Sequence, residues 1–433
     1  MGPEVIAIVL IAGMLILLLM GLEVGWAVGI IGLIGLIWCV GQPVNQVAYT
    51  MWSSLNSFTL TAMPLFILMG AVLGNTGVNE YLFTAVDKWV GHFPGGLVIS
   101  VLAGNAVFAA MSGSTMAATA TFGKVAYPVM EKRGYDPSFA LGSIAAGSVL
   151  APIIPPSILL ILYGAWQGLS VVDLLAAGVI PGFILTALYL TTAVVIVKIK
   201  PGLTPSPVKY SWSERSRALL GILPFVLLIG GVLGSVFGGL MTPTEAGGLG
   251  AALSIVLALF YRRLTFGLLR QSLLDTVKVT SFSLFIMAMS TLMSHVFNSA
   301  GIIPLVKEFV LGLHVGKYTI LAGFFVMYLI MGCFFDSWSM LFLTFPFVMP
   351  VMIALGFNPI WWGVVYVMAA EQGTITPPFG LSLFVLRSVI PRHSISTIVK
   401  GALPYLIPIY INILLLILFP QLTLWLPGIL GGK

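Results

Sequence analysis

The sequence predicts an all-α polytopic membrane protein made of two inverted repeats, each with a re-entrant helical hairpin and a broken transmembrane helix. Hydrophobic residues make up 59% of the 433 positions and charged residues only 7%, which leaves too little polar surface for a soluble fold. One stretch occurs twice, because residues 128–159 and 350–381 are identical at 9 of 32 gapless positions. Four of these identities are prolines, which a generic apolar helix would not place in register.

Uninterrupted apolar segments account for most of the predicted membrane spans. A transmembrane helix needs about 20 predominantly apolar residues. The first such segment follows Glu4 rather than a basic stretch and shows no small-residue cleavage site, so we expect it to be retained as a helix. The candidate segments are 5–22, 25–40, 57–75, 172–197, 218–240, 244–261, 279–298 and 401–427.

Four other apolar segments are interrupted near their middle by small, polar or proline residues. We interpret 95–130 and 317–352 as hairpins that enter and leave on one side of the membrane. The segments 137–168 and 360–390 are then crossing helices unwound at Pro155-Pro156 and Pro377-Pro378, since free backbone at membrane depth must be satisfied by protein or water. Ordinary proline-kinked spans are the alternative, but the duplication argues against them. Matching breaks in two halves predict a binding site near the bilayer midplane.

These segments predict an alternation of scaffold and core regions along the chain. Short amphipathic segments at 78–92, 263–275 and 303–315 are either interfacial arms or ordinary linkers. The expected parts are N-terminal scaffold helices in 1–75, a first repeat core in 76–171, scaffold helices in 172–300, a second repeat core in 301–390 and a C-terminal scaffold helix in 391–433.

The positions of the basic residues predict the orientation. Lysine and arginine gather in the connections 198–217, 261–278 and 387–400, which the positive-inside rule places in the cytoplasm. Both termini then lie outside, and the charged loop 131–136 lies inside while its uncharged repeat partner 353–358 lies outside. The two halves are therefore inverted. Topology also accounts for the net charge of +6 without any nucleic-acid partner.

Polar clusters at the hairpin turns predict cation binding. Hydroxyls and free carbonyls at a mid-membrane turn form a set of hard oxygens suited to Na⁺, and helix N-termini offer N–H groups to an anion. A carboxylate at bilayer depth costs a few kcal/mol unless it is paired or binds an ion. Asp336 is therefore the strongest candidate for a cation ligand. For serine and threonine, a bond to a carbonyl of the same helix is the usual alternative. The clusters comprise Ser112, Ser114 and Thr115 in the first hairpin and Asp336, Ser337 and Ser339 in the second.

Two further acids and the cysteines carry less information. Glu371 has two interpretations, since it either lines the site or reaches a neighbouring helix end. Glu245 lies in the first turn of its predicted helix, where a structural cap is the better interpretation. Cys39 and Cys333 both lie in apolar segments, and the four histidines are scattered. Neither a disulfide framework nor a metal cluster is predicted.

Five motifs in order resemble one family. They are Met111–Ala118, Ile153–Ser157, Met241–Gly247, Gly332–Asp336 and Gly373–Gly380. Together they look like the large membrane subunit of a tripartite ATP-independent periplasmic (TRAP) transporter, over essentially the whole chain. This resemblance implies an elevator-type secondary transporter in the bacterial inner membrane, with both termini periplasmic, that takes up organic acids with Na⁺. It implies no enzyme activity and no cofactor besides Na⁺ as coupling ion.

The resemblance also implies partners and site residues. A periplasmic binding protein would deliver the substrate, and we expect the small four-helix membrane subunit on a separate polypeptide. One Na⁺ site would use Ser112, Ser114 and Thr115 with backbone near Gly147, Leu150 and Pro152, and a second would use Gly332, Asp336, Gly373 and Thr376. We expect the substrate at Pro156, Ser337, Ser339, Thr374 and Pro378.

Other functional classes fit the sequence less well. The resemblance also implies membership of the ion transporter superfamily, and a Na⁺/carboxylate transporter of that superfamily without a binding protein would share the repeats and hairpins. An intramembrane protease would need Ser114 beside His295, or Asp336 beside a second aspartate, but the first pair lies in opposite halves and no second aspartate lies at membrane depth. A channel is disfavoured because nothing resembles a filter. Dicarboxylates, sialic acids, sugar acids and keto acids remain equal candidates as substrate.

Overall fold

A computed structural model describes residues 2–206 and 208–431, and every regular element in these residues is a helix. The predicted all-α fold is thus confirmed. Seven helices are long and apolar enough to cross a membrane, by length and composition. These candidate spans are Phe58–Asn75, Val171–Ile199, Trp212–Phe237, Pro243–Phe260, Phe266–Ser299, Ser337–Ala354 and Ile395–Leu418.

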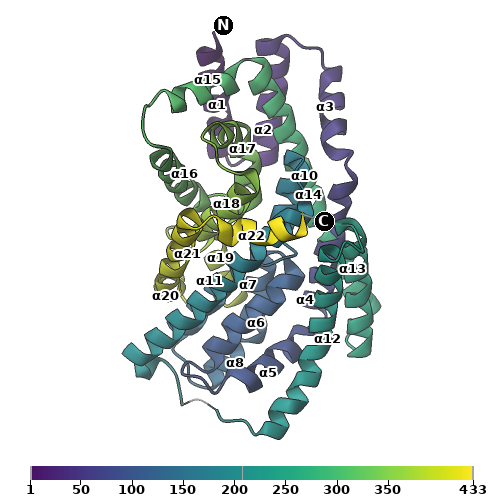
Figure 1. The fold of residues 1–433 in the computed structure, drawn as a ribbon, viewed down its shortest axis with the longest axis vertical. Coiled ribbons are helices and arrows are strands. Elements are labelled where there is room, and N and C mark those ends of the chain that lie inside the picture. The colour runs from purple at the N-terminus through teal and green to yellow at the C-terminus, as the bar shows by residue number, and fades with distance from the viewer. Residues whose placement is uncertain (1, 207, 432–433) are drawn as a thin grey trace.

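The first part of the chain forms eleven α-helices (Figure 1). Glycines mark several of the helix boundaries. Gly41, Gly113, Gly134 and Gly168 all adopt positive φ between helices. The helices are α1 (Pro3–Leu19), α2 (Val24–Ile34, continued by a π-helical turn Gly35–Val40), α3 (Asn45–Leu55), α4 (Ala62–Asn75), α5 (Asn79–Val90), α6 (Leu97–Ser112), α7 (Thr115–Val125), α8 (Tyr127–Lys132), α9 (Pro137–Ser148), α10 (Ile158–Gln167) and α11 (Val171–Ile199).

The remaining helices include the longest one, α14. Serine and threonine caps begin α12, α13 and α14, each accepting a hydrogen bond from the third residue beyond. The helices are α12 (Trp212–Phe237), α13 (Pro243–Phe260), α14 (Phe266–Ser299), α15 (Ile302–Leu311), α16 (Lys317–Gly332), α17 (Ser337–Ala354), α18 (Pro359–Thr374), α19 (Leu381–Val389), α20 (Ile395–Ala402), α21 (Leu406–Leu418) and α22 (Gln421–Leu430).

Helix boundaries recur at the spacing of the sequence repeat. The helix α7 begins at Thr115 and α17 begins at Ser337, 222 positions later. The same offset separates the starts of α9 at Pro137 and α18 at Pro359. It also separates the cis peptide bonds Pro155-Pro156 and Pro377-Pro378. Each Pro-Pro pair lies in a gap between helices, from 149 to 157 in one copy and from 375 to 380 in the other.

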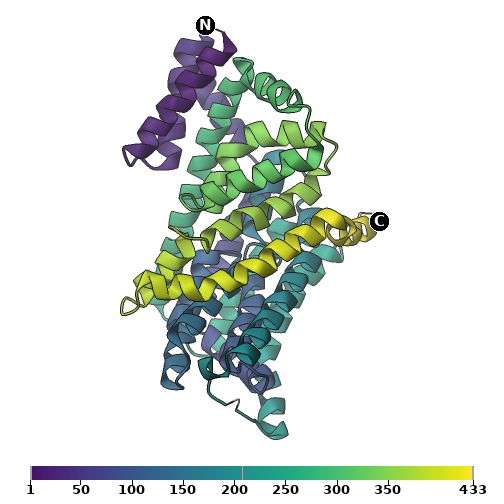
Figure 2. The same ribbon diagram turned by 90° about the vertical axis from the view of Figure 1, so that its left-hand side faces the viewer.

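Two segments differ from the sequence expectation. The C-terminal segment 391–433 is not one uninterrupted helix, because α20 and α21 join through a 3₁₀ turn at Leu403–Tyr405 to form the candidate span Ile395–Leu418, whereas α22 follows a break at Pro420. Figure 2 shows these helices running obliquely across the molecule. The segment 263–275 is not a separate arm, since most of it forms the start of the continuous helix α14. The other two amphipathic segments do form short helices, α5 and α15.

Polar contacts gather the basic connections at one end of the molecule. The Asp136 amide donates to the Leu203 carbonyl at 3.0 Å, which joins the loop 131–136 to the connection 198–217. Arg392 pairs with Glu131, and Arg263 lies 3.4 Å from Glu80 at the start of α5. The loop 131–136 and all three basic connections therefore lie on the side of α5 and α8, in the lower half of Figure 1.

Candidate functional site

The tip of the first hairpin packs against the first helix break. Ser112 ends α6, and its buried hydroxyl oxygen has no hydrogen-bond partner among the described residues. Gly113 then turns the chain with φ 56°, and a Cβ at this position would lie 3.0 Å from the Pro156 carbonyl oxygen. Ser114 caps α7 by accepting the Ala117 amide at 3.4 Å. A residue without a side chain is thus required where the tip meets the break.

A second buried oxygen lies on the same face of α6. Asn105 is two turns before Ser112 and is 1% exposed, so both side chains project to one side of the helix. Its amide nitrogen donates to the Val101 carbonyl at 3.1 Å, but its amide oxygen has no partner in the described residues. A Cβ at Gly147 would lie 2.7 Å from that nitrogen. Gly147 therefore lets Asn105 pack against the end of α9.

Backbone carbonyls of the first break complete this group. Gly147 and Leu150 accept amides at the end of α9, at 3.2 Å from Leu150 and 2.9 Å from Ile154. The Pro152 carbonyl accepts the Ser157 hydroxyl at 2.5 Å. Each carbonyl oxygen has two lone pairs, so Gly147 and Pro152 keep a further acceptor site, whereas the Leu150 carbonyl also accepts the Ile153 amide, at 3.1 Å. Neutral oxygens of this type, with the unpartnered oxygens of α6, fit a hard monovalent cation.

In the second hairpin, Asp336 caps a helix. One carboxylate oxygen accepts the amides of Trp338 and Ser339, both at 3.1 Å, and the other accepts the Ser339 hydroxyl. Asp336 occupies the N-cap position of α17, as Ser114 does for α7. The predicted ligand therefore also supports its own helix, while the predicted substrate contact Ser339 is engaged with it.

The remaining predicted residues of the second copy divide into two groups. Gly332 and Gly373 bring α16 and α18 into backbone contact, because a Cβ on Gly332 would lie 2.7 Å from the Gly373 Cα. The hydroxyls of Thr374 and Thr376 donate to carbonyls of their own segment, Glu371 at 2.8 Å and Gln372 at 2.6 Å, as in the ordinary alternative for such residues. Pro156 is buried, whereas Pro378 is exposed.

Glu371 connects the two hairpin tips. Its carboxylate accepts the Thr115 hydroxyl on one oxygen at 2.7 Å and the Ser337 hydroxyl on the other at 2.6 Å. Glu371 is 3% exposed, and no lysine, arginine or histidine of the described residues lies within 4.0 Å of it. It thus reaches helix ends, one of its two expected roles. Sequence reasoning left open whether Glu371 lines the site or reaches a neighbouring helix end, and a lone acid in an apolar helix was the available signal.

A cavity of about 390 Å³ lies beside the tips, between α4, α7 and α14. Both Ser112 and Ser114 line it, together with Trp338 of the second hairpin. Lys124 lines it as well and forms no ion pair within the described residues. Asp275, by contrast, accepts the amide nitrogens of Asn75 at 2.9 Å and Gln271 at 2.7 Å. Lys124 therefore offers an uncommitted positive charge in this cavity, which sequence reasoning missed.

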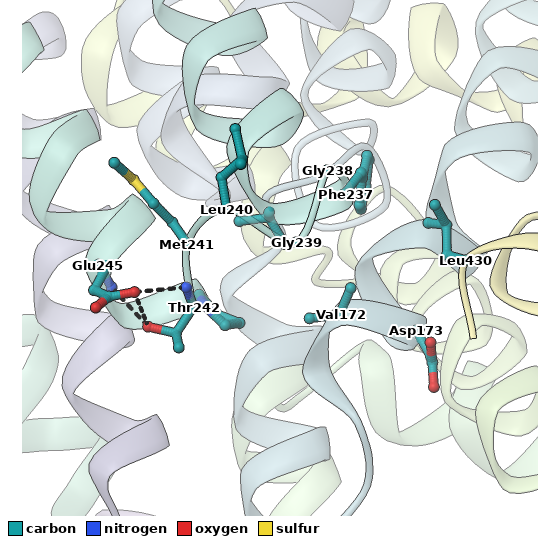
Figure 3. Close-up of a pocket in the computed structure, with 12 residues that line it drawn as sticks. Val172, Asp173, Phe237, Gly238, Gly239, Leu240, Met241, Thr242, Glu245 and Leu430 are labelled. Carbon is teal, nitrogen blue, oxygen red and sulfur yellow. Dashed lines mark hydrogen bonds between the residues drawn. The ribbon is translucent and has the colours of Figure 1, made fainter. Parts of the chain in front are cut away.

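A second cavity, of about 480 Å³, adjoins the loop between α12 and α13 (Figure 3). At its edge, the Glu245 carboxylate accepts the Thr242 amide at 2.8 Å, and the Thr242 hydroxyl accepts the Glu245 amide at 3.3 Å. Figure 3 shows this pair on one side of the cavity and Asp173 with Leu430 on the other. The interpretation of Glu245 as a helix cap is confirmed.

Residues required for the protease alternative lie in different cavities. Ser114 lines the cavity beside the hairpin tips. His295 lines a separate cavity of about 650 Å³ between α3 and α14, where its Nε2 pairs with the Gln42 amide oxygen at 2.7 Å. Within the described ranges, no three His, Cys, Asp or Glu side chains gather in a metal-binding group.

The chain is similar to known transport proteins over nearly its whole length. Residues 11–422 match the family described as tripartite ATP-independent periplasmic transporter, DctM component. It is 33% identical to the uncharacterized protein YgiK of Salmonella typhimurium, covering 97% of both chains. It is 32% identical to the sialic acid TRAP transporter large permease protein SiaM of Vibrio cholerae, covering 98% of both. With the YdaH transporter of Alcanivorax borkumensis it shares the fold, at TM-score 0.58 and 16% identity over 90% of each chain.

Proposed function

This chain belongs to the DctM family of tripartite ATP-independent periplasmic transporters, and we propose that it takes up an organic acid with Na⁺ after a periplasmic protein delivers the substrate. It is a multi-pass membrane protein and a subunit of a transporter permease, and it is not an enzyme. Relatives of similar length are named for sialic acid, C4-dicarboxylates and 2,3-diketo-L-gulonate. All of these substrates are carboxylates, which supports a carboxylate for this chain.

The observation that carries Na⁺ coupling is the pair of unpartnered oxygens on α6. Buried polar atoms are nearly always hydrogen-bonded, yet Asn105 Oδ1 and Ser112 Oγ on one helix face have no partner in the described residues. A Na⁺ ion between the tip and the break around Gly147 would satisfy Ser112 Oγ, and a water of its hydration shell would satisfy Asn105 Oδ1, since seven residues of helix separate the two Cα atoms by about 10 Å. Leu150 and Pro152 carbonyls would complete its shell, with Ser114 and Thr115 at the hairpin tip.

We place a second Na⁺ site at the other hairpin. Gly332 and Gly373 hold the ends of α16 and α18 in contact, so free carbonyls of both helices meet there. Asp336 and Thr376 lie close to these glycines in sequence and would add a carboxylate and a hydroxyl. A negatively charged ligand makes this the stronger of the two sites.

The cavity beside the tips is our candidate for the substrate. Lys124 would attract the substrate carboxylate, and Ser114 would hydrogen-bond to it near the α7 N-terminus. Trp338 brings the second hairpin to the same cavity, beside the expected contacts Ser337, Ser339 and Thr374. Pro156 and Pro378, which the sequence also predicts beside the substrate, are not among the residues that line this cavity.

The arrangement of the hairpins supports an elevator. In Figure 1 the open end of the first hairpin, at α5 and α8, lies at the opposite end of the molecule from α15 and α16. This is the arrangement that inverted repeats produce. We propose that residues 95–168 and 317–390 move as a core against a scaffold formed by the remaining helices.

The basic connections near α5 and α8 would face the cytoplasm, and we propose that the protein lies in the inner membrane with both termini periplasmic. A small membrane subunit would bind the scaffold. The test is uptake by proteoliposomes that contain this chain, its small subunit and its binding protein. Uptake that requires an inward Na⁺ gradient, and that disappears without either partner, supports the proposal. Full uptake with K⁺ in place of Na⁺ and no proton gradient overturns the coupling.

A further inference from the structure

We propose that Glu371 is a positioning residue that ties the two hairpin tips together, so that both Na⁺ sites respond to binding as one unit. The inference rests on the proposed function for the ions, but the tie itself rests on geometry. Thr115 and Ser337 are the first residues of α7 and α17. They occupy equivalent positions of the repeat, and each donates its hydroxyl to a different oxygen of the same carboxylate.

Burial makes both hydrogen bonds important. Glu371 is 3% exposed, and a buried charge is tolerated only when it is well paired or hydrogen-bonded. Thr115 and Ser337 supply charge-assisted hydrogen bonds, and the N-terminal ends of α7 and α17 supply positive partial charge. If either tip moved away, one carboxylate oxygen would be left without a partner inside the protein. Separation of the tips is therefore costly.

Within the described residues, no other side-chain hydrogen bond or ion pair links α7 to α17. The helix α7 packs chiefly on α9 and α19, whereas α17 packs on α14, α15 and α18. Glu371 belongs to α18, and Tyr366 of the same helix also donates to the Ser337 carbonyl at 2.5 Å. The second tip is thus fixed to α18 on two sides, while the first tip is fixed to α18 through Thr115. Glu371 is the polar link between them.

The first experiment measures amide hydrogen exchange at both tips in the purified complex with the small subunit. Thr115→Val and Ser337→Ala each remove one hydroxyl. Each variant should speed exchange about tenfold in both 113–117 and 336–340, the factor expected from one hydrogen bond to a charged group. Glu371→Gln should affect both tips as well, since an amide can accept on only one atom.

Two threonines on the same helices provide matched controls. Thr119 on α7 and Thr344 on α17 are buried, and neither hydroxyl is hydrogen-bonded to Glu371. Thr119→Val and Thr344→Val should change exchange only in their own hairpin. If Thr115→Val and Ser337→Ala also acted only on their own hairpin, the tips would be independent and the proposal would be wrong.

The second experiment measures how steeply uptake depends on Na⁺ concentration. The unmodified complex should respond more steeply than a single-site curve, and Glu371→Gln should reduce the response to a single-site curve. Unchanged steepness in this variant overturns the coupling role. A complete lack of Na⁺ dependence in the unmodified complex would instead overturn the proposed function. Hydrogen exchange would still decide whether the tips are tied.

Discussion

Gly332 and Gly373 bring the backbones of α16 and α18 so close that a Cβ on Gly373 would lie 2.7 Å from the Gly332 carbonyl carbon. The atoms nearest to a Cβ on either glycine belong to the backbone, which cannot rotate away as a side chain can. This contact fixes where the second hairpin begins relative to the broken helix that carries Glu371.

We predict that Gly332→Ala or Gly373→Ala lowers stability by about 1–3 kcal/mol, the usual cost of overpacking. The measurement is thermal unfolding in detergent, followed by intrinsic fluorescence. Gly323→Ala on the same helix as Gly332 is the control, because a Cβ there meets nothing within 4 Å. That control should be neutral or slightly stabilising. Equal melting temperatures for all three variants would contradict the close contact.

Asn105→Leu should abolish stabilisation by Na⁺ while leaving the Na⁺-free protein at least as stable. The change removes an amide oxygen without a partner among the described residues, and replacing an unsatisfied group by an apolar one of similar shape costs little. A bound ion stabilises a protein by mass action, so the melting temperature should no longer rise with NaCl relative to KCl. Ser290→Ala removes another unpartnered buried oxygen, on α14, and should keep the Na⁺ response.

Asp336→Asn should weaken Na⁺ dependence with little loss of stability. Asparagine caps helices as well as aspartate does, so the amides of Trp338 and Ser339 retain an acceptor. Asp336→Ala removes both charge and cap and should cost about 1 kcal/mol more. Uptake against Na⁺ concentration and thermal unfolding separate the two effects. Normal Na⁺ dependence of the asparagine variant would leave Asp336 as a cap alone.

Lys124→Met should raise the KM for the carboxylate substrate about tenfold or more, the loss expected when a charged hydrogen bond is removed. Lys124→Arg should retain most of the affinity because it keeps the charge. Lys132→Met, in the exposed last turn of α8, controls for the general loss of one basic residue near this end. A similar KM for Lys124→Met and Lys132→Met would remove Lys124 from substrate recognition.

A disulfide between α4 and α7 should stop transport reversibly. A Cβ at Gly74 would lie 3.6 Å from the Thr121 hydroxyl oxygen, so Gly74→Cys with Thr121→Cys joins the proposed scaffold to the proposed core in this conformation. Cys39 and Cys333 are replaced by serine beforehand. Gly32→Cys with Leu292→Cys joins two scaffold helices, since a Cβ at Gly32 would lie 3.4 Å from the Leu292 Cγ. The scaffold pair should leave uptake intact, and undiminished uptake with the first pair would argue against an elevator.

The helix ends were predictable because their signals are local. The Pro155-Pro156 and Pro377-Pro378 pairs fall in gaps between helices, as expected from residues that lack an N–H and restrict their neighbours. Gly113 likewise ends α6 with a positive φ. By contrast, the C-terminal segment was expected as one helix, because apolar composition hid the effect of its prolines.

The partners of the site residues were not predictable, because they depend on tertiary packing. Thr115 and Glu371 are 256 positions apart, and no periodicity in the sequence relates them. Asn105 is an isolated polar residue in the sequence, and only the fold brings Gly147 against it. Lys124 resembled any basic residue near a helix end until the cavity with Ser114 appeared.

The equivalent helices α7 and α17 are capped by a neutral residue, Ser114, and an acidic one, Asp336. At the position of the first half that is equivalent to Glu371, the chain has the uncharged residue Val149. Duplication has thus kept the backbone plan of the two halves while placing both tip carboxylates in one of them. Moving one elementary charge across the membrane potential is worth about 2.3 kcal/mol per 100 mV, so any carboxylate charge that the tips carry across the membrane comes from the second half. The paired hairpins are alike in shape and unlike in their response to voltage.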